Sequence, residues 1–566
     1  MRKLLSGFIL LTGFWISNRS FSQSVFLNND SHQAAIIERL EVKRGVLSNT
    51  FHDNAKPFSR EAIVKYFSGH DTSFTNHISK VDLANIRYLL ADSWEHIPEA
   101  EADTFNNKRR LFKHFFKEKS DFYYYKNDDF DVHVNPIFHF MYGSDSQVGD
   151  LKSKDLFINT RGVEIRGRVN KKLGFYTMIT ENQMASPNYI VNFYKLYKGY
   201  PYQSLVKPKD EDTRNLQVDF FSAIGYITFK PMKSLTMSFG HDRNFIGSGI
   251  RSMVLSDFSS PYLQLKSELK LGKMQYLSIL GQMTNTQIPN PLNSLLTYPP
   301  KYLAFHHLNF NIGKNLNLGL FESVMYGKRD FGFEFNYLNP VIFYRWIEGN
   351  IGSSDNAFVG ADFKLNALKT LSFYGQYFLD EYNSKEFKKE GWWAKKYSWQ
   401  LGGKYIDVFT IENLDFQFEH NRARPYIYSH FTTYTNYVNY STPLAHPLGA
   451  NFKESIMTIK YQPLSKLFFS ATAMYAMRGD DKDSVNYGSN LLTSNRVGRG
   501  SDYNNFIGQG LKNQLKHHEV ALSFMPYHNL FFDFVYQRRK DVYQSKPETI
   551  FYVALRLNMA RRNMIF

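Results

Sequence analysis

The most regular feature of the chain is an alternation of apolar and polar residues that recurs from about residue 131 onward. In 235–240, Leu235, Met237 and Phe239 fall on one side of an extended segment and polar or small residues on the other. A period of two predicts a β-strand. In 163–169, charged residues alternate with apolar ones, and lipid would not accept three charges on one strand face. The charged face, formed by Glu164, Arg166 and Arg168, is therefore expected to line a hydrated lumen.

The connections between these segments alternate in length. Short turns, such as 271–273 and 313–315, alternate with long polar connections, such as 243–261 and 422–453. This order is typical of a transmembrane β-barrel, in which the short turns are periplasmic and the long loops lie outside. The segments predict an all-β barrel of about eighteen antiparallel strands that starts and ends in the periplasm. Counting 331–345 as a strand pair, and not as part of an outer loop, would raise the number to about twenty.

The first 120 residues follow different patterns. Residues 1–22 resemble a secretory signal peptide, with two basic residues, an apolar stretch and small residues before the expected cleavage site. The period then becomes helical, and it predicts four helices that carry apolar stripes. The stripes are Ile36, Ile37 and Leu40; Ile63, Tyr66 and Phe67, after the cap residue Ser59; Leu83, Ile86, Leu90 and Trp94; and Leu111, Phe112, Phe115 and Phe116.

Helices of this kind cannot bury their stripes singly, so a small bundle is expected on the periplasmic side. The predicted division is a signal peptide at 1–22, a periplasmic α-helical bundle at 23–125 and the barrel at 126–566. A plain folding cap for the barrel is the alternative role of the bundle.

The composition supports a barrel and favours some classes of binding partner over others. Aromatic residues make up 17% of the chain, with 38 Tyr and 51 Phe, which suits interfacial girdles and a lipid-facing band. The alternative is a large soluble all-β protein such as a propeller, but no blade repeat is visible. There are no cysteines, which excludes disulfides and thiolate chemistry. The net charge of +16 is spread out, so it favours anionic lipid or acidic polysaccharide over nucleic acid.

Catalytic and metal-binding patterns are weak. The chain lacks a nucleophile elbow, a phosphate-binding glycine loop and paired metal-binding histidines. The adjacent pair His306 and His307 would point to opposite faces of a strand. The acidic group at 480–483 lacks the spacing of a calcium loop and is expected to be a solvated turn. We expect no enzyme activity, cofactor or metal, although a hydrolase built from scattered Ser, His and Asp residues is an alternative.

Three blocks carry a resemblance to a known family. They are 240–256 with Pro261, 337–345, and 443–454. The first resembles a loop of the capsule-assembly outer-membrane proteins of the Wzi family. The second and third resemble a branch of that superfamily in gliding bacteria, whose members are named as gliding-motility outer-membrane proteins. The resemblance implies an eighteen-stranded barrel with a periplasmic helical bundle and a role in retaining capsular polysaccharide. Where the family has a tryptophan and a proline, this chain has Phe245 and Ser248, and Phe is a weaker stacking platform for a sugar.

The candidate glycan-binding residues lie in predicted outer loops. Arg243 could donate a fork of hydrogen bonds to an acidic sugar, and Phe245 could stack on a sugar ring. Gly247 and Gly249 would let the backbone approach the ligand closely. The full set of candidates is Asp242, Arg243, Phe245, Gly247, Gly249, Trp392, Trp393 and Tyr434. The alternative for Arg243 is an internal strut that pins its loop inside the barrel.

We therefore expect a monomeric outer-membrane barrel, closed to free diffusion, that contacts outer-membrane lipid and supports capsular or surface polysaccharide assembly or attachment. One alternative is a protein-interaction role in gliding motility or in a secretion apparatus. Another is a diffusion channel for sugars or hydrophobic solutes.

Overall fold

The protein is described by a computed structural model. The described residues are 24–28, 32–68, 74, 78–98, 101, 103–108, 110–147, 155–170, 172–209, 217–288, 297–329, 332–341, 343–381, 385–386, 388–562 and 564–566. The predicted signal peptide lies outside them. Among these residues, no helix has the length and apolar character needed to cross a membrane.

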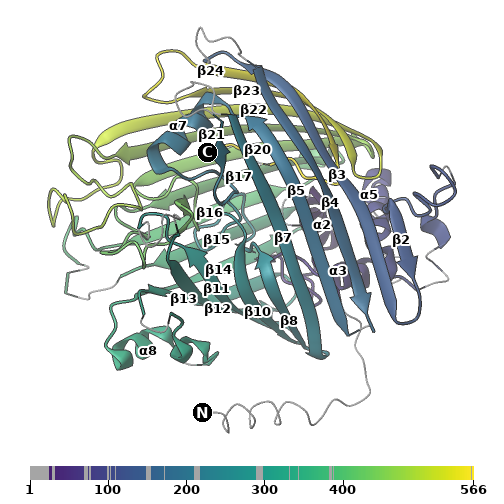
Figure 1. The fold of residues 1–566 in the computed structure, drawn as a ribbon, viewed down its shortest axis with the longest axis horizontal. Coiled ribbons are helices and arrows are strands. Elements are labelled where there is room, and N and C mark those ends of the chain that lie inside the picture. The colour runs from purple at the N-terminus through teal and green to yellow at the C-terminus, as the bar shows by residue number, and fades with distance from the viewer. Residues whose placement is uncertain are drawn as a thin grey trace.

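The sheet is a closed antiparallel barrel in which neighbouring strands follow one another along the chain (Figure 1). Twenty strands take part, and two of them, β2 (Tyr123–Lys126) and β6 (Lys207–Pro208), are short additions to β3 and β7. The remaining eighteen confirm the predicted strand number. They are β3 (Phe130–Asp145), β4 (Asp155–Val169), β5 (Leu173–Ala185), β7 (Gln217–Met232), β8 (Leu235–Asp242), β10 (Tyr262–Leu271), β11 (Met274–Thr284), β12 (Pro300–Ile312), β13 (Leu316–Gly327), β14 (Asn356–Ala367), β15 (Leu371–Leu379), β16 (Tyr397–Tyr405), β17 (Leu414–Ala423), β20 (Phe452–Leu464), β21 (Leu467–Asp480), β22 (Leu511–Tyr527), β23 (Leu530–Lys540) and β24 (Glu548–Leu557).

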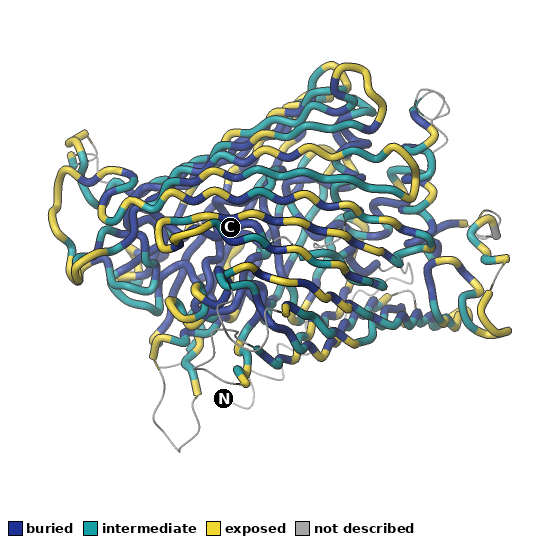
Figure 2. Tube along the Cα trace, turned by 90° about the horizontal axis from the view of Figure 1, so that it is seen from above, coloured by how far each residue is buried: buried dark blue, intermediate teal, exposed yellow. Residues whose placement is uncertain are grey.

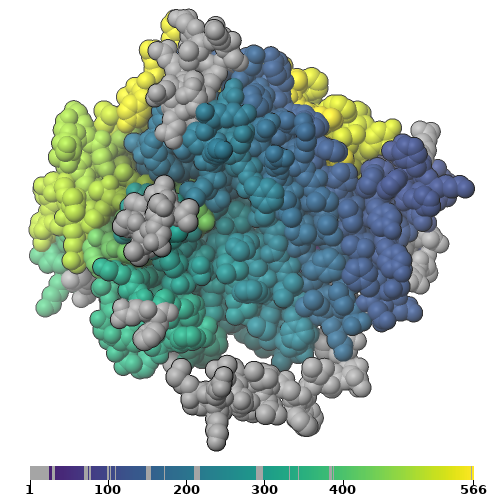
Figure 3. Space-filling view, viewed as in Figure 1, coloured from purple at the N-terminus to yellow at the C-terminus, as the bar shows by residue number. Residues whose placement is uncertain are grey.

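The inner and outer faces of the barrel wall carry different kinds of residue, as the alternation predicts. Along β3, Asp131, His133 and Asn135 are buried toward the lumen, whereas Phe140 and Tyr142 are exposed on the outside. Buried positions also alternate with more exposed ones along other wall strands, most regularly along β11 and β23 (Figure 2). On the side shown in Figure 3, the strands form a continuous outer surface. This apolar exterior and polar interior are those of a barrel that spans the outer membrane.

The connections confirm the predicted alternation of short turns at one end of the barrel and long loops at the other. β3 runs toward the end with the long loops, and β24 returns from it and pairs with β3 to close the barrel. Part of the connection between β13 and β14 forms the 3-10 helix η3 (Phe335–Leu338) and the α-helix α8 (Tyr344–Ile351). It is therefore an outer excursion and not a strand pair, so the number of strands stays at eighteen.

Helices before the first strand gather at the short-turn end of the barrel (Figure 1). They are α2 (His32–Arg44), α3 (Arg60–Phe67) and α5 (Lys80–Asp92), followed by the 3-10 helix η1 (Trp94–His96). Ile37, Leu40 and Ile63 are buried where the three α-helices meet. The Oγ of Ser59 accepts a hydrogen bond from the backbone N–H of Ala62, which confirms the predicted cap of α3. The first three predicted helices are therefore confirmed.

The fourth predicted helix, near 111–116, is wrong. Phe112 and Phe116 have φ angles of 54° and 52°, which break a right-handed helix. The ring of Phe115 instead stacks on Phe122, with centroids 4.5 Å apart. The apolar spacing matched a helix, but Leu111 and Phe112 are exposed, so this segment has no buried stripe to stabilise one.

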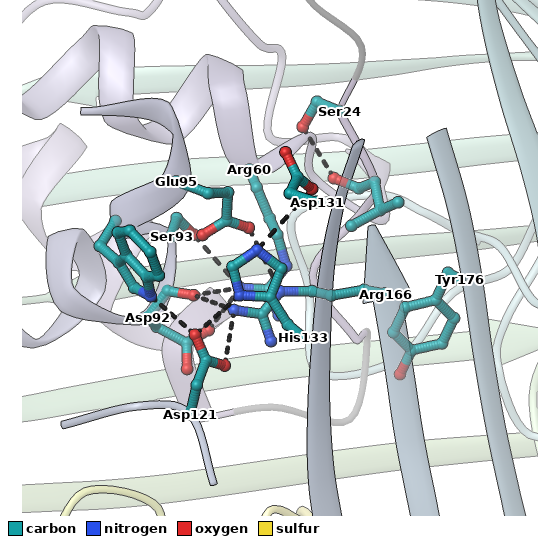
Figure 4. Close-up of polar contacts among 12 residues, drawn as sticks. Ser24, Arg60, Asp92, Ser93, Glu95, Asp121, Asp131, His133, Arg166 and Tyr176 are labelled. Carbon is teal, nitrogen blue, oxygen red and sulfur yellow. Dashed lines mark hydrogen bonds and ion pairs between the residues drawn. The ribbon is translucent and has the colours of Figure 1, made fainter. Parts of the chain in front are cut away.

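Buried charges fasten the helical segment to the barrel wall. The guanidinium of Arg166 on β4 lies 3.2 Å from Glu95 and 3.1 Å from Asp121 (Figure 4). Arg60 of α3 pairs with Asp92 at 2.7 Å. Burial alone would raise the pKa of Glu95, but the charge of Arg166 outweighs it and lowers that pKa to about 2. The lumen-facing charges that the sequence placed on β4 therefore serve as anchors for the helices.

Further ion pairs attach the helices on the opposite side. Lys364 of β14 pairs with Glu41 of α2 at 2.5 Å and also with Asp53. Arg39 pairs with Asp407 and Asp415 beside the turn between β16 and β17, at 2.6 Å each. The segment is thus held from several sides within the short-turn mouth of the barrel.

The chain does not end beside the last strand. After β24, residues up to Phe566 lie inside the barrel, where Figure 1 marks the C-terminal end. The ring of Phe566 packs on Phe193 of α7 (Asn188–Tyr197) and on Phe258, with centroids 5.5 and 5.2 Å apart. This corrects the expectation that both ends lie in the periplasm. Arg556 helps to set this course, because its Nη1 donates to the backbone oxygen of Met559 at 2.6 Å.

Candidate functional site

The connection 243–261 runs through the lumen, and we call it the lumen loop. Its short strand β9 (Phe245–Ile246) pairs with β1 (Ala55–Lys56) of the N-terminal segment. The backbone N–H of Gly247 donates to the carbonyl of Asn54 at 2.8 Å. The loop therefore extends from the rim of the barrel to the helices at its other end.

Polar residues on the inner wall hold the lumen loop in place. The backbone N–H groups of Ile250 and Arg251 donate to the carboxylate of Glu419 at 2.6 and 3.1 Å. A Cβ on Gly249 would lie 2.5 Å from a Glu419 oxygen, so only glycine fits there without a shift. The guanidinium of Arg251 lies 3.3 Å from Glu454 on β20. These contacts give the loop one fixed path through the lumen.

The connection 424–451 folds onto the lumen loop from the long-loop side. The hydroxyl of Ser256 donates to the carbonyl of Leu444 at 3.2 Å, and the hydroxyl of Tyr428 donates to that of Met253 at 2.6 Å. His446 lies 2.8 Å from Glu454. Two of the three resemblance blocks, 240–256 and 443–454, thus pack against each other inside the barrel and share a buried polar network.

The structure brings five of the candidate residues together, but inside the barrel. Arg243 and Phe245 are buried, which corrects the expectation of an exposed outer loop. The Nη1 of Arg243 donates to the backbone oxygen of Asp257 at 3.2 Å, and the ammonium of Lys56 lies 5.0 Å from the Phe245 ring. This geometry favours the internal strut for Arg243. The glycan-binding role of Asp242, Arg243, Phe245, Gly247 and Gly249 stays a prediction.

The lumen loop turns inward because its apolar residues have no other place to be buried. Ile246, Met253, Val254 and Leu255 join a cluster with residues of the inner wall and of 424–451. An eighteen-stranded barrel is too wide for its own inward side chains to fill, so loops can pack there. The sequence shows that this loop is rich in glycine and serine. It does not indicate whether the loop turns into the lumen or lies outside the barrel.

The tryptophans lie at a different place, where two outer connections join. The backbone N–H of Trp393 donates to the carbonyl of Asp502 at 2.8 Å, and that of Asn505 donates to Gly391 at 2.8 Å. Arg424 ties the two segments together through the carbonyls of Trp392 and Asn505, at 3.2 and 2.9 Å. Both tryptophan side chains are half-buried, so they keep a surface that faces outward.

Charged and aromatic groups surround these tryptophans. The guanidinium of Arg499 lies 4.0 Å from the Trp393 ring centroid, within cation–π range. The hydroxyl of Tyr503 donates to Glu386 at 2.9 Å, and Phe506 is exposed. We call this group the rim patch; it comprises Glu386, Lys389, Trp392, Trp393, Arg499, Tyr503 and Phe506. The sequence does not mark Glu386, Lys389, Arg499, Tyr503 or Phe506 as candidates, because their loops have no period and lie far apart in the chain.

Tyr434 does not belong to this group. Its ring lies beside Gly327 at the end of β13, where a Cβ on the glycine would be 3.1 Å from it. The eight candidates therefore divide among the end of β8 with the adjoining lumen loop, the rim patch and the edge of β13.

A metal site needs several His, Cys, Asp or Glu side chains close together. Within the part of the chain that the structure describes, no three of these side chains are grouped to hold a metal ion. His307 faces the lumen and lies 2.6 Å from Asp362, whereas His306 faces outward and contacts Tyr344. This pair confirms that adjacent strand histidines point to opposite faces.

A family model for the capsule assembly protein Wzi matches residues 143–526, which is more than half of the chain. The chain belongs to the Wzi family. The family match confirms the resemblance to the Wzi family, whereas the likeness of 337–345 and 443–454 to a branch in gliding bacteria stays a prediction. No curated protein sequence matches the chain.

Solved structures agree on the fold. Escherichia coli Wzi, described as an outer-membrane protein involved in group 1 capsule assembly and a carbohydrate-binding β-barrel, is 13% identical. The match covers 95% of this chain and all of that one, with a TM-score of 0.57. Pseudomonas aeruginosa OprD and OccK8 are each 8% identical over 75% of this chain, with TM-scores of 0.40 and 0.41. The first of these structures shows that this Wzi-family chain shares the barrel fold; the other two are too distant to carry an argument.

Proposed function

We propose that this Wzi-family barrel supports capsule assembly by binding an acidic surface polysaccharide at the rim patch. The observation that carries the proposal is the join of two outer loops that presents Trp392 and Trp393 beside cationic side chains. Family membership supports the role in capsule assembly, and the carbohydrate binding described for Escherichia coli Wzi supports a polysaccharide as the ligand.

The chemistry of the rim patch suits such a ligand. A half-exposed indole offers an apolar face on which the C–H groups of a sugar ring can pack. Arg499 and Lys389 stand beside the rings, with Lys389 5.5 Å from the Tyr503 centroid and Arg499 4.0 Å from that of Trp393. Arg499 pairs with Asp502 at 2.5 Å and Lys389 pairs with Glu386 at 2.9 Å. A sugar carboxylate would therefore bind these cations by sharing or replacing those partners. The net charge of +16 would add a long-range attraction for an anionic polymer.

The lumen contents favour a surface role over transport. The lumen loop, 424–451 and the end of the chain occupy the interior, and their contacts with the wall are specific hydrogen bonds. We infer a binding protein without catalytic activity or cofactor that works as a monomer. The comparisons give no support to a role in motility or secretion, and the filled interior opposes a diffusion channel.

The test compares Trp392→Ala and Trp393→Ala with Phe409→Ala, a matched control. Phe409 is an exposed aromatic at a short turn, on the opposite side of the membrane from the rim patch. The probe is capsular polysaccharide purified from the producing cells. Each rim variant should bind it about five- to thirtyfold more weakly, equivalent to a loss of about 1–2 kcal/mol. The control should match the parent protein, and equal binding by all variants would refute the rim patch as the site.

The lumen residues need a separate comparison. Arg243→Ala and Phe245→Ala should be measured for both thermal stability and polysaccharide retention on cells. Loss of retention with an unchanged melting temperature would support direct binding at the lumen loop. A melting temperature that falls together with retention would support the strut.

A further inference from the structure

One segment of the outer connections lies on the outside of the barrel. Residues 332–341 and 343–351, which include η3 and α8, fold back over the wall formed by β12, β13 and β14. Figure 1 shows α8 outside the barrel, beside these strands. We call this segment the outer plate. Its position differs from that of the lumen loop and of 424–451, which turn inward.

The wall under the outer plate carries polar side chains on its outward face. Ser278, His306 and Glu322 are direct neighbours across β11, β12 and β13. His307 contacts the lumen residue Asp362, so His306 must point outward. The same alternation places Ser278 and Glu322 outside. Polar and charged groups on the outward face of a membrane barrel are destabilising when they meet lipid.

The outer plate covers these groups and bonds to them. The hydroxyl of Tyr344 contacts the Nε2 of His306, and their ring centroids lie 4.2 Å apart. The backbone N–H of Arg345 donates to the carboxylate of Glu322 at 3.1 Å. The hydroxyl of Tyr276 donates to the backbone oxygen of Pro340. The outward polar groups of this wall thus act as the docking site for the plate.

Apolar packing completes the attachment. Tyr337, Tyr344 and Ile347 of the plate are buried against outward side chains of β12 and β13, namely Tyr302, Ala304, Val324 and Tyr326. The inner face of the plate therefore forms a small hydrophobic core together with the wall. The plate is a folded element with a fixed inner side.

The opposite face of the plate is apolar and uncovered. Val341, Phe343 and Trp346 are 85%, 76% and 60% exposed, and Phe335 and Leu338 are exposed beside them. A soluble surface rarely gathers so many large apolar side chains within twelve residues. This face continues the lipid-facing band of the wall, where Phe310, Leu318 and Leu320 are exposed toward the short turns.

We propose that the outer plate inserts its exposed face into the outer leaflet of the membrane and binds the acyl chains of the lipids there. The continuity with the lipid-facing band is the observation that selects lipid as the occupant. The side chain of Arg345 on the same helix is 74% exposed and pairs through Nη1 with Glu348 at 2.6 Å. Its other N–H groups can reach anionic headgroups. An amphipathic helix with Trp and Phe on one face and a cation at its edge has the character of an interfacial membrane element.

The plate would fix the depth of the barrel at one side of its circumference. The rim patch lies in other loops, so this inference does not depend on the proposed glycan binding. Failure of one test leaves the other untouched.

The absence of cysteine makes the test direct, because a single introduced cysteine can carry a spin label. The site is Val341→Cys, with Phe343→Cys as a second site in case one variant folds poorly. Leu320→Cys, at a position 63% exposed on the lipid-facing wall, is the lipid reference. Val497→Cys, at a position equally exposed in the loop before β22, is the water reference.

Full-length labelled proteins are reconstituted in vesicles of phosphatidylcholine with a minor share of phosphatidylglycerol. Collisions with oxygen, which concentrates in lipid, are compared with collisions with a water-soluble nickel complex. The oxygen-to-nickel ratio at 341 should match that at 320 and exceed that at 497 several-fold. A ratio at 341 equal to that at 497 would overturn the proposal. Exclusion of both reagents, with dipolar broadening between labels, would also overturn it and would assign the plate to contact between copies of the chain.

Discussion

At the scale of single residues, buried charges decide how the helices sit in the barrel. Arg166 stands among Glu95, Asp121 and Glu164, at distances of 3.1 to 3.3 Å. None of these groups could keep its charge at low cost without the others. Glu164 and Arg166 lie on one strand, but Glu95 and Asp121 are too far away in the sequence for a local pattern to show the cluster.

Replacing Arg166 by Met should leave Asp121 and Glu95 buried without a counter-charge. We expect an apparent loss of stability of about 3–5 kcal/mol, measured by thermal unfolding in detergent. Arg161→Met is the matched control, because Arg161 lies on the same strand but is exposed on the outward face. Equal melting temperatures for the two variants would contradict the anchoring role of Arg166.

The same cluster predicts that acid loosens the helices. Burial lowers the pKa of His96 from 6.5 to about 4, so its stabilising contribution is complete above pH 6.5 and is lost between pH 6.5 and 4. The pKa of Glu95 falls from 4.5 to about 2, where the charge of Arg166 outweighs the opposing effect of burial. Its contribution is complete above pH 4.5 and is lost toward pH 2.

Hydrogen exchange in residues 32–98, corrected for the intrinsic rate at each pH, should therefore rise relative to the wall strands below pH 6.5. Protection that stays constant down to pH 4 would show that His96 is not held neutral. The variant His96→Gln should reduce the loss between pH 6.5 and 4 but not remove it, because burial also lowers the pKa of His52 in the same segment to about 4.

At the scale of elements, the amphipathic stripes predicted the helices. Only the tertiary packing decided which residues of each helix are buried. In α5, Ile86 and Leu89 are buried in the shared core, whereas Leu90 is only half-buried. The sequence stripe placed Leu90 inward. The difference arises because α5 also contacts β20 and the turn before β23, as in the hydrogen bond of Asn85 to Gln462 at 2.8 Å.

Leu89→Asp should therefore destabilise the helical segment more than Leu90→Asp. A charge at Leu89 would be buried without a partner, and we expect a cost of a few kcal/mol. Limited proteolysis of the segment 32–98 in detergent provides the measurement. Equal protease resistance of the two variants would contradict the packing of α5 seen here.

Two long outer connections take opposite directions. The backbone of the lumen loop bonds to Glu419 and Gln376 of the inner wall, whereas the outer plate docks on His306 and Glu322 outside. In each case, polar residues of the wall help to determine whether the connection lies inside or outside the barrel. The sequence of the connection alone does not determine this. A one-residue shift of a strand would exchange the two faces and would remove both docking sites.

At the scale of the whole molecule, the barrel is a closed container. The helices fill the short-turn end, the lumen loop passes through the middle, and 424–451 folds over it. A cavity of about 460 Å³ lies beside the helices, lined by residues such as Glu38, Arg251, Lys460, Glu519 and Arg556.

The intact protein in a planar bilayer should therefore show no steady conductance of porin size. A general porin reconstituted in the same way serves as the positive control. Replacing 243–261 with a short Gly-Ser turn should raise the conductance, since it removes the contact between the helices and 424–451. A large ohmic conductance from the intact protein would refute a closed lumen.

The sequence by itself determined the barrel, its eighteen strands, the orientation of the turns, the lumen-facing charges and the first three helices. These features follow from periodicity, which depends only on local backbone geometry and on the contrast between lipid and water. The tertiary structure alone decided the direction of each long loop, the lumen position of the chain end and the union of 385–396 with 495–509 into the rim patch. Such contacts join residues far apart in the chain, and their free energy comes from burial and pairing that no local pattern records.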